Sequence, residues 1–228
     1  MKMNNTIRQT ALAATCVACA VTAPAATADS FSLEAFVLSD DKLVSESTVS
    51  LWISRPEKRP ELVSSTTSDK NGTARFKDID QVNGDVFYLR SSGGKIKGTP
   101  VPQYETLAVL NGDQRATATL NEISTIGSLW PIAGMFDYQT GLAGTANGLL
   151  IGSSQVSNLV NVEQGFFGAV VLNGTNLTKS ETVARINTLA ALTALCGAEL
   201  ARQHCSDYLA ITGSNSTLEA LVKLATQP

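Results

Sequence analysis

Histidine is almost missing from this chain of 228 residues, which contains only His204. The sequence also lacks G-x-S-x-G, G-x-G-x-x-G, the Walker loop and H-E-x-x-H, which mark common hydrolase, nucleotide-binding and zinc sites. A single histidine excludes a histidine-rich metal site and leaves one candidate base for a serine or cysteine nucleophile. We therefore predict no catalytic residue, no metal ligand and no cofactor site, as in a protein that is not an enzyme.

The sequence has no apolar run long enough to span a membrane, and its main apolar run is a short one near the N-terminus. Residues 1–28 begin with two basic side chains, continue with that run and end in A-T-A, which predicts a secretory signal peptide cleaved between Ala28 and Asp29. We expect an exported protein, periplasmic or extracellular, with no transmembrane segment in its mature chain. Cys16 and Cys19 are expected to leave with the signal; a lipid anchor at one of them is the alternative.

Positive charge is scarce beyond the signal, where 15 basic residues face 20 acidic ones. Because nucleic-acid binding depends on basic residues that neutralise phosphates, this balance argues against a nucleic-acid partner. The charges are also unevenly spread: 24 lie between Asp29 and Leu120 and only 11 follow. We predict two domains, over residues 29–118 and 119–228.

The first domain consists of short strand-like segments separated by turn-forming residues such as Asn71-Gly72. In T-V-S-L-W-I-S, residues Val49, Leu51 and Ile53 alternate with polar residues and Trp52. About seven such segments at regular intervals predict an Ig-like antiparallel β-sandwich. Together with helices in the second domain, this gives an α+β fold.

One stretch of the first domain carries a more specific pattern. It reads T-x-D-x-x-G-x-x-x-F-x-x-I over residues 67–79, followed by G-D-x-x-Y-L over residues 84–89. The pattern resembles the carboxypeptidase-regulatory-like, or prealbumin-like, β-sandwich modules of many exported proteins, over about residues 30–95. This resemblance implies a rigid spacer or a binding surface and provides no catalytic residue.

The second domain is expected to be helical and small. Val183, Ile186 and Leu189 recur at helical spacing, and Thr178 with Glu181 has the spacing of a capping box, which predicts a helix start there. A terminal helix is expected from Thr217.

Three glycines in this domain lie four residues apart, at Gly144, Gly148 and Gly152. On a helix they would form one face that a neighbouring helix approaches closely. A loop, or a helix that inserts into a membrane, is the alternative.

The order of segments in residues 120–228, including the N-T-L-A run and both remaining cysteines, looks like a helical module of uncharacterised exported bacterial proteins. Those proteins often carry NHL-type β-propeller repeats after this module. The chain ends at Pro228 without such repeats, so the resemblance implies that their ligand is absent here or is bound by a partner. It transfers no activity to any residue.

Cys196 and Cys205 have three interpretations. A zinc site needs four ligands, and a nucleophile would depend on His204 as its base. A disulfide needs only an oxidising compartment, which the signal provides, and we predict this one. On one continuous helix the two Cα atoms would lie about 13 Å apart, but a disulfide needs them within about 7 Å. The helix must therefore end or turn at Gly197 or at Gln203-His204.

The remaining polar groups suggest weaker hypotheses. The pairs Asp40-Asp41 and Asp78-x-Asp80 are the minimum for a carboxylate-dependent hydrolase, although turn acids are usually only solvated. A calcium ion among Asp69, Asn71 and Asp78 lacks the ligand series of an EF-hand.

Trp52 points away from the apolar face of its strand, either as a ligand platform for a sugar or, as we favour, as a packing residue. The sequence thus favours a non-enzymatic structural or interaction protein of the cell envelope that binds a protein or a polysaccharide. An exported hydrolase and a membrane-associated helical module are the alternatives.

Overall fold

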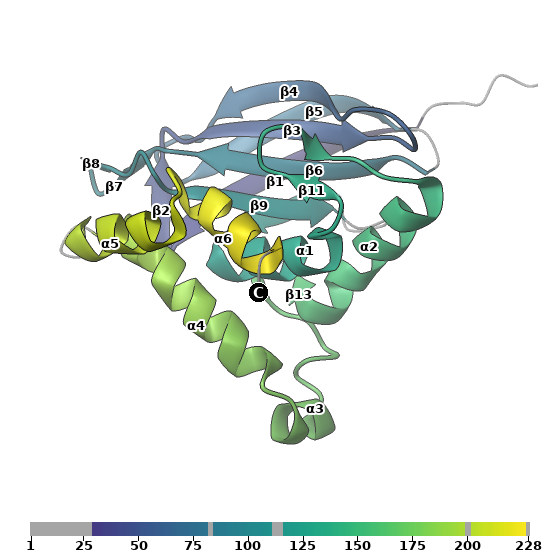
Figure 1. Cartoon of the computed structure of the whole chain (residues 1–228). Coiled ribbons are helices and arrows are strands. Elements are labelled where there is room, and N and C mark those ends of the chain that lie inside the picture. Colours follow the sequence, from purple (N-terminus) through teal and green to yellow (C-terminus); the bar gives the residue numbers. More distant parts are fainter. Residues whose placement is uncertain (1–28, 82–83, 111–115, 199–201, 227–228) are drawn as a thin grey trace, which may run out of the picture.

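The computed structural model describes residues 29–228 apart from 82–83, 111–115, 199–201 and 227–228 (Figure 1). The expected signal peptide, including Ala28, Cys16 and Cys19, lies outside the described residues. Within them, two β-sheets come first and the helices follow, which confirms the α+β class. No helix in the described part of the chain is long and apolar enough to cross a membrane.

The first sheet is built around β1 (Asp29–Ser39). Strand β1 pairs with β10 (Thr117–Leu120), β2 (Lys42–Ser45) and β5 (Thr73–Gln81). Strand β2 continues to the short strands β7 (Lys95–Ile96) and β8 (Thr99–Pro100). All of these pairs are antiparallel except β1–β10, so the predicted antiparallel sandwich includes one parallel pair. The predicted domain boundary at residue 118 falls inside β10.

The second sheet has the order β4-β3-β6-β9, with all pairs antiparallel. Its strands are β4 (Glu61–Thr67), β3 (Thr48–Ser54), β6 (Val86–Ser92) and β9 (Glu105–Leu110). Val49, Leu51 and Ile53 of β3 are buried, as their alternation predicted. They belong to one hydrophobic core that continues into the helices.

Helix α1 (Glu122–Ile132) is the central element of the helical half. It contacts β9 of the sandwich and also α2 (Ala146–Leu159), α4 (Thr182–Ala194) and α6 (Thr217–Thr226). Eight of its eleven residues are buried. The other elements of this half are α3 (Gly174–Lys179), α5 (Arg202–Thr212), and the two hairpins β11 (Phe136–Asp137) with β12 (Gly141–Leu142) and β13 (Val160–Asn161) with β14 (Phe166–Phe167). Because α1 packs on both sides, the sandwich and the helices share one interior.

The helical half covers the edge of the second sheet at β9. The amide of Glu105 donates to the Thr217 hydroxyl at 2.8 Å. The amides of Leu107 and Val109 donate, each at 3.0 Å, to the hydroxyls of Thr125 and Ser128 on α1. A sheet edge leaves backbone groups without a strand partner, and here three side chains from α1 and α6 bind them. The opposite edge strand, β4, has six exposed residues out of seven.

Helix predictions were right in position and partly wrong in detail. The terminal helix begins at Thr217 as expected. The capping box is wrong: Thr178 lies within α3, where its hydroxyl donates to the Gly174 carbonyl, and α4 begins after Glu181 without a side-chain cap. Threonine hydroxyls often bond a carbonyl one turn earlier in a helix, and this bond competes with capping.

The glycine spacing serves close packing of α2 against the end of α1. A Cβ atom added at Gly148 would lie 2.9 Å from the Met135 sulfur, and one added at Gly152 would lie 2.7 Å from the Met135 Cε. Gly144 also faces Met135 but precedes the helix. Two of the three glycines therefore form the expected helix face.

Candidate functional site

The two cysteines form the predicted disulfide, with sulfur atoms 2.07 Å apart and Cα atoms 4.8 Å apart. Helix α4 ends at Ala194 and a single 3-10 turn, Leu195–Gly197, carries Cys196 away from the helix axis. The bend thus occurs at the first of the two expected places, whereas Gln203 and His204 lie inside α5. A bonded sulfur is neither a nucleophile nor a zinc ligand, so the disulfide is structural.

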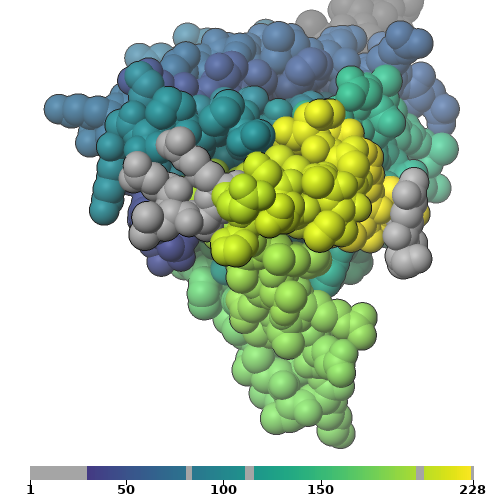
Figure 2. All heavy atoms as spheres, turned by 60° about the vertical axis from the view of Figure 1, so that its left-hand side comes forward, coloured from purple at the N-terminus to yellow at the C-terminus, as the bar shows by residue number. Residues whose placement is uncertain are grey.

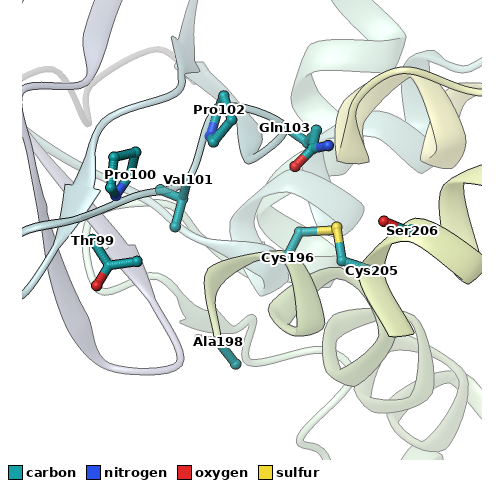
Figure 3. Close-up of a pocket in the computed structure, with 9 residues that line it drawn as sticks. All are labelled: Thr99, Pro100, Val101, Pro102, Gln103, Cys196, Ala198, Cys205 and Ser206. Carbon is teal, nitrogen blue, oxygen red and sulfur yellow. A yellow bond between two sulfur atoms is a disulfide. The ribbon is translucent and has the colours of Figure 1, made fainter. Parts of the chain in front are cut away.

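A hollow of about 330 Å³ lies between this disulfide corner and the segment that joins β8 to β9 (Figure 3). Its lining residues are Thr99, Pro100, Val101, Pro102, Gln103, Cys196, Ala198, Cys205 and Ser206. A second hollow of about 310 Å³ shares Thr99, Val101 and Ala198 and adds Lys42 and Lys97. Neither set of described lining residues includes a carboxylate or a histidine. These residues therefore provide no carboxylate or imidazole that could act as a general base.

The disulfide corner packs against a buried polar cluster. A Cβ atom at Gly197 would collide with Ser39, so glycine is needed for this close approach. The Ser39 hydroxyl donates to Oε1 of Glu122 at 2.9 Å, and the Tyr104 hydroxyl lies 2.9 Å from the same oxygen and 2.6 Å from the Leu38 carbonyl. Tyr104 is the donor in both contacts, so its one hydrogen is shared between the Leu38 carbonyl and the Glu122 carboxyl.

Burial raises the pKa of Glu122 above its ordinary value of 4.5, although bonds from its own amide, Ser39, Tyr104 and the Asp40 amide oppose the rise. Burial and the neighbouring Glu122 carboxyl also raise the pKa of Tyr104. The cluster holds the start of α1 against the β1–β2 turn, because Glu122 bonds Ser39, the Asp40 amide and Tyr104, all in the sandwich half. It joins the two halves of the protein.

A raised carboxyl pKa predicts a definite pH dependence. The folded state binds the Glu122 proton more tightly than the unfolded state, so this group stabilises the fold most below the ordinary carboxyl pKa. Its contribution falls as the pH rises through the window between the ordinary and the raised value. We expect urea unfolding across pH 3–8 to show that the free energy of unfolding of the wild type falls relative to that of Glu122→Gln as the pH rises. Parallel profiles would contradict the raised pKa.

Removal of the disulfide gives a second prediction. Cys196→Ser/Cys205→Ser should lower the free energy of unfolding by about 2.5–3 kcal/mol, because the bond closes a ring of about ten residues in the unfolded chain. Urea unfolding measures this loss, and thiol titration of the denatured mature wild type should find thiols only after reduction. Two titratable thiols without reductant would show that the bond does not form.

A second polar cluster joins the second sheet to the start of α6. Arg90 of β6 donates to Glu105 of β9 at 2.9 Å and to the Tyr138 carbonyl at 3.0 Å, and its guanidinium lies 4.4 Å from the centre of the Tyr138 ring. The Ser216 hydroxyl donates to Glu105 at 3.0 Å and also accepts from the Glu219 amide in the first turn of α6. The side chains of Arg90 and Glu105 are only 24% and 10% exposed. These groups serve packing and capping.

Trp52, the candidate ligand platform, is half-buried. Its ring is stacked on Tyr88 with the centroids 6.3 Å apart, and its indole N–H is buried without a hydrogen-bond partner. The adjoining hollow measures about 80 Å³, too small for the 300–1,000 Å³ typical of ligand sites. This geometry favours the packing interpretation of Trp52.

The carboxylates named from the sequence do not meet in a hollow. Asp40 and Asp41 form the β1–β2 turn, where Asp40 pairs with Lys42, and Asp78 and Asp80 are exposed on β5. Asp69 accepts the amides of Asn71 and Thr73, and these bonds lower its pKa. The described residues contain no group of three or more His, Cys, Asp or Glu side chains arranged to hold a metal ion.

Sequence reasoning missed the two buried clusters of Glu122 and Glu105. The one local signal was at Glu122, which follows Asn121 at the start of a helix where acidic residues are common for electrostatic reasons. Their partners lie 13 to 112 residues away, a separation that no local pattern reports.

No protein-family model matches the chain, and no curated protein matches its sequence. The resemblances to prealbumin-like modules and to NHL-associated helical modules therefore remain expectations.

Proposed function

We propose that the protein is an exported, non-enzymatic interaction protein that binds another protein through a projecting helical arm. The signal-like N-terminus and the disulfide support export, because disulfides persist in oxidising compartments. The buried carboxyl groups of Glu105 and Glu122 bind other parts of the fold, so they are committed to stability. Among the hollows around the described residues named above, none is lined by a carboxylate, which disfavours the hydrolase alternative.

The observation that carries this proposal is the arm, which we define as residues 170–181. Helix α3 lies at the far end of α4 from the two sheets (Figure 1), and in Figure 2 this green region extends below the yellow α5 and α6. Residues 172–181 are all exposed, and α3 buries no side chain. Val170, Leu172 and Leu177 nevertheless place apolar groups there, with Leu177 47% exposed.

An exposed arm with apolar side chains adds little stability to the fold, so its presence favours a role in binding. A helix of six residues is marginal without tertiary contacts. Val170, Leu172 and Leu177 expose three apolar side chains within eight residues of the chain, which is more than the scattered single residues of an ordinary surface. The aliphatic side chains favour a protein partner. A polysaccharide would favour an exposed aromatic platform, and Trp52 is half-buried on Tyr88. The structure of the arm therefore supports protein recognition over sugar recognition.

Cross-linking of the mature protein in envelope extracts tests the proposal. The wild type should capture a defined partner, and Leu172→Asp/Leu177→Asp should lose it while unfolding at the same temperature, because both side chains are exposed. The control is Leu62→Asp on β4, which is also exposed and lies outside the arm. A partner that the arm variant retains, and binds equally after purification, would contradict the proposed role of the arm.

A further inference from the structure

A hollow of about 220 Å³ lies where helices α1, α4 and α6 meet. Its seven lining residues are all apolar, and the most buried of them, Ile126, Leu129 and Leu221, are at most 2% exposed. Leu224 also lines the hollow and is 40% exposed, so the space extends from the interior to the surface. Protein interiors leave few voids larger than a water molecule. The junction of these three helices is therefore incompletely filled by the chain's own side chains.

The walls of this hollow select the kind of molecule that can occupy it. Among the lining residues, only Trp130 has a polar side-chain atom, its indole N–H. A buried water makes about three hydrogen bonds, which one donor does not provide. A peptide segment would bury backbone amides and carbonyls without partners, and an ionised group would lose its hydration without an opposite charge. These walls therefore accept an uncharged molecule that has no hydrogen-bonding groups to satisfy.

We infer that this hollow binds a small free hydrocarbon, an aromatic ring or a short aliphatic chain. A wall atom that faces a void lacks contacts on that side and loses their dispersion attraction, and such a molecule restores these contacts. An apolar cavity of about 150 Å³ in a protein interior stays dry and binds benzene. At about 220 Å³, this hollow has room for the same molecule. Because α1, α4 and α6 form the site, it is separate from the arm and does not depend on the proposed function.

Benzene is the probe for this site, and methyl-resolved NMR of the mature protein locates where it binds. Titration with benzene should shift the methyl signals of Ile126, Leu129 and Leu221 in a saturable manner, because an aromatic ring shifts the signals of the nuclei that it contacts. The methyl signals of Val49 and Leu51, which are buried on β3, should stay in place. Saturating benzene should also raise the midpoint of urea unfolding, because a ligand that binds only the folded state stabilises it.

A larger side chain at Ala225 tests whether the hollow itself is the binding site. Ala225 lines the hollow and is half-buried, so in Ala225→Leu the new side chain competes with the ligand for one volume. This variant should bind benzene about tenfold more weakly than the wild type, or less tightly still. Ala184→Leu, which adds the same group to an exposed position of α4, is the matched control and should bind as the wild type does. If Ala225→Leu lowers the urea midpoint, Ala225→Val makes the same test with a smaller side chain.

The absence of saturable methyl shifts up to the solubility limit of benzene would overturn the inference, and so would equal affinity in the wild type and both Ala225 variants. Neutral phosphatidylcholine vesicles distinguish a free molecule from a lipid tail. If the vesicles shift the same methyl signals and benzene does not, the hollow holds an acyl chain and the inference fails. Leu172→Asp/Leu177→Asp should bind benzene as the wild type does, so loss of the protein partner and loss of the hydrocarbon are separate results.

Discussion

Replacement of Glu105 by alanine is expected to lower the free energy of unfolding by about 3–5 kcal/mol, which is the usual loss when one partner of a buried ion pair is removed. The pair with Arg90 is shielded from water, with the Glu105 side chain only 10% exposed. Removing the carboxylate leaves the guanidinium without its anion, and it also deprives Ser92 and Ser216 of an acceptor. Urea unfolding at neutral pH measures the loss.

Two controls separate the buried charge from other effects. Glu61→Ala removes the exposed partner of Arg55 and should change stability by less than about 1 kcal/mol, since exposed ion pairs contribute little. Glu105→Gln retains an acceptor of similar size and should lie between alanine and wild type. If Glu105→Ala is no more destabilising than Glu61→Ala, the pair does not hold the sheet to α6.

The second large effect is expected at the covered edge of β9. Thr125→Val/Ser128→Ala removes two hydroxyls that accept the amides of Leu107 and Val109. Both hydroxyl residues are fully buried, so the amides are left without acceptor or water. An unsatisfied buried donor costs about 1–3 kcal/mol, and the double variant should therefore lose about 2–6 kcal/mol.

The matched control uses exposed hydroxyls on helices. Thr188→Val in α4 and Ser157→Ala in α2 remove groups that bond only to carbonyls of their own helix. This pair of substitutions should change the free energy of unfolding by only a few tenths of a kcal/mol per site. Equal losses in the two double variants would mean that α1 does not complete the sheet.

The sandwich was predictable because its information is local. The alternation of Val49, Leu51 and Ile53 lies within a few residues, and Gly72 has the positive φ expected of a turn at Asn71-Gly72. The expected hairpin there is wrong, because this turn joins β4 and β5, which belong to different sheets. The disulfide was predictable as well, because the predicted compartment is oxidising and the residues for a zinc site or a nucleophile are missing. Given that bond, the helix rise excludes a continuous helix over residues 196–205. The bend between the helices followed from distance alone.

The burial of residues that contact elements distant in the sequence was harder to predict. All six residues of β9 are buried, since the strand contacts β10 of the opposite sheet and also α1 and α6, so it has no exposed polar face to alternate. Glu105 and Glu122 look like surface acids until partners distant in sequence bury them. Thr178 matches a capping box but bonds a carbonyl of its own helix. These features depend on tertiary contacts.

The arm belongs to the same class of feature. A polar segment with two leucines gives no sequence signal of projection, and its exposure becomes evident only when the rest of the helical half is in place. The helices thus have two roles: α1 and α6 close the sandwich, and α3 presents apolar groups outward. The first role assigns the buried polar groups to the stability of the fold, and binding is then left to the surface.

Native-state hydrogen exchange of the amides of Glu105, Leu107 and Val109 tests that assignment most directly. If the hydroxyls of Thr217, Thr125 and Ser128 bind these amides, the amide hydrogens should exchange only through global unfolding. Their exchange should then be as slow as that of the amides of the central strand β6. Thr125→Val/Ser128→Ala should speed exchange at Leu107 and Val109. Exchange in the wild type as fast as that of the amides on the open edge of β4 would contradict the claim that the helices complete the sheet.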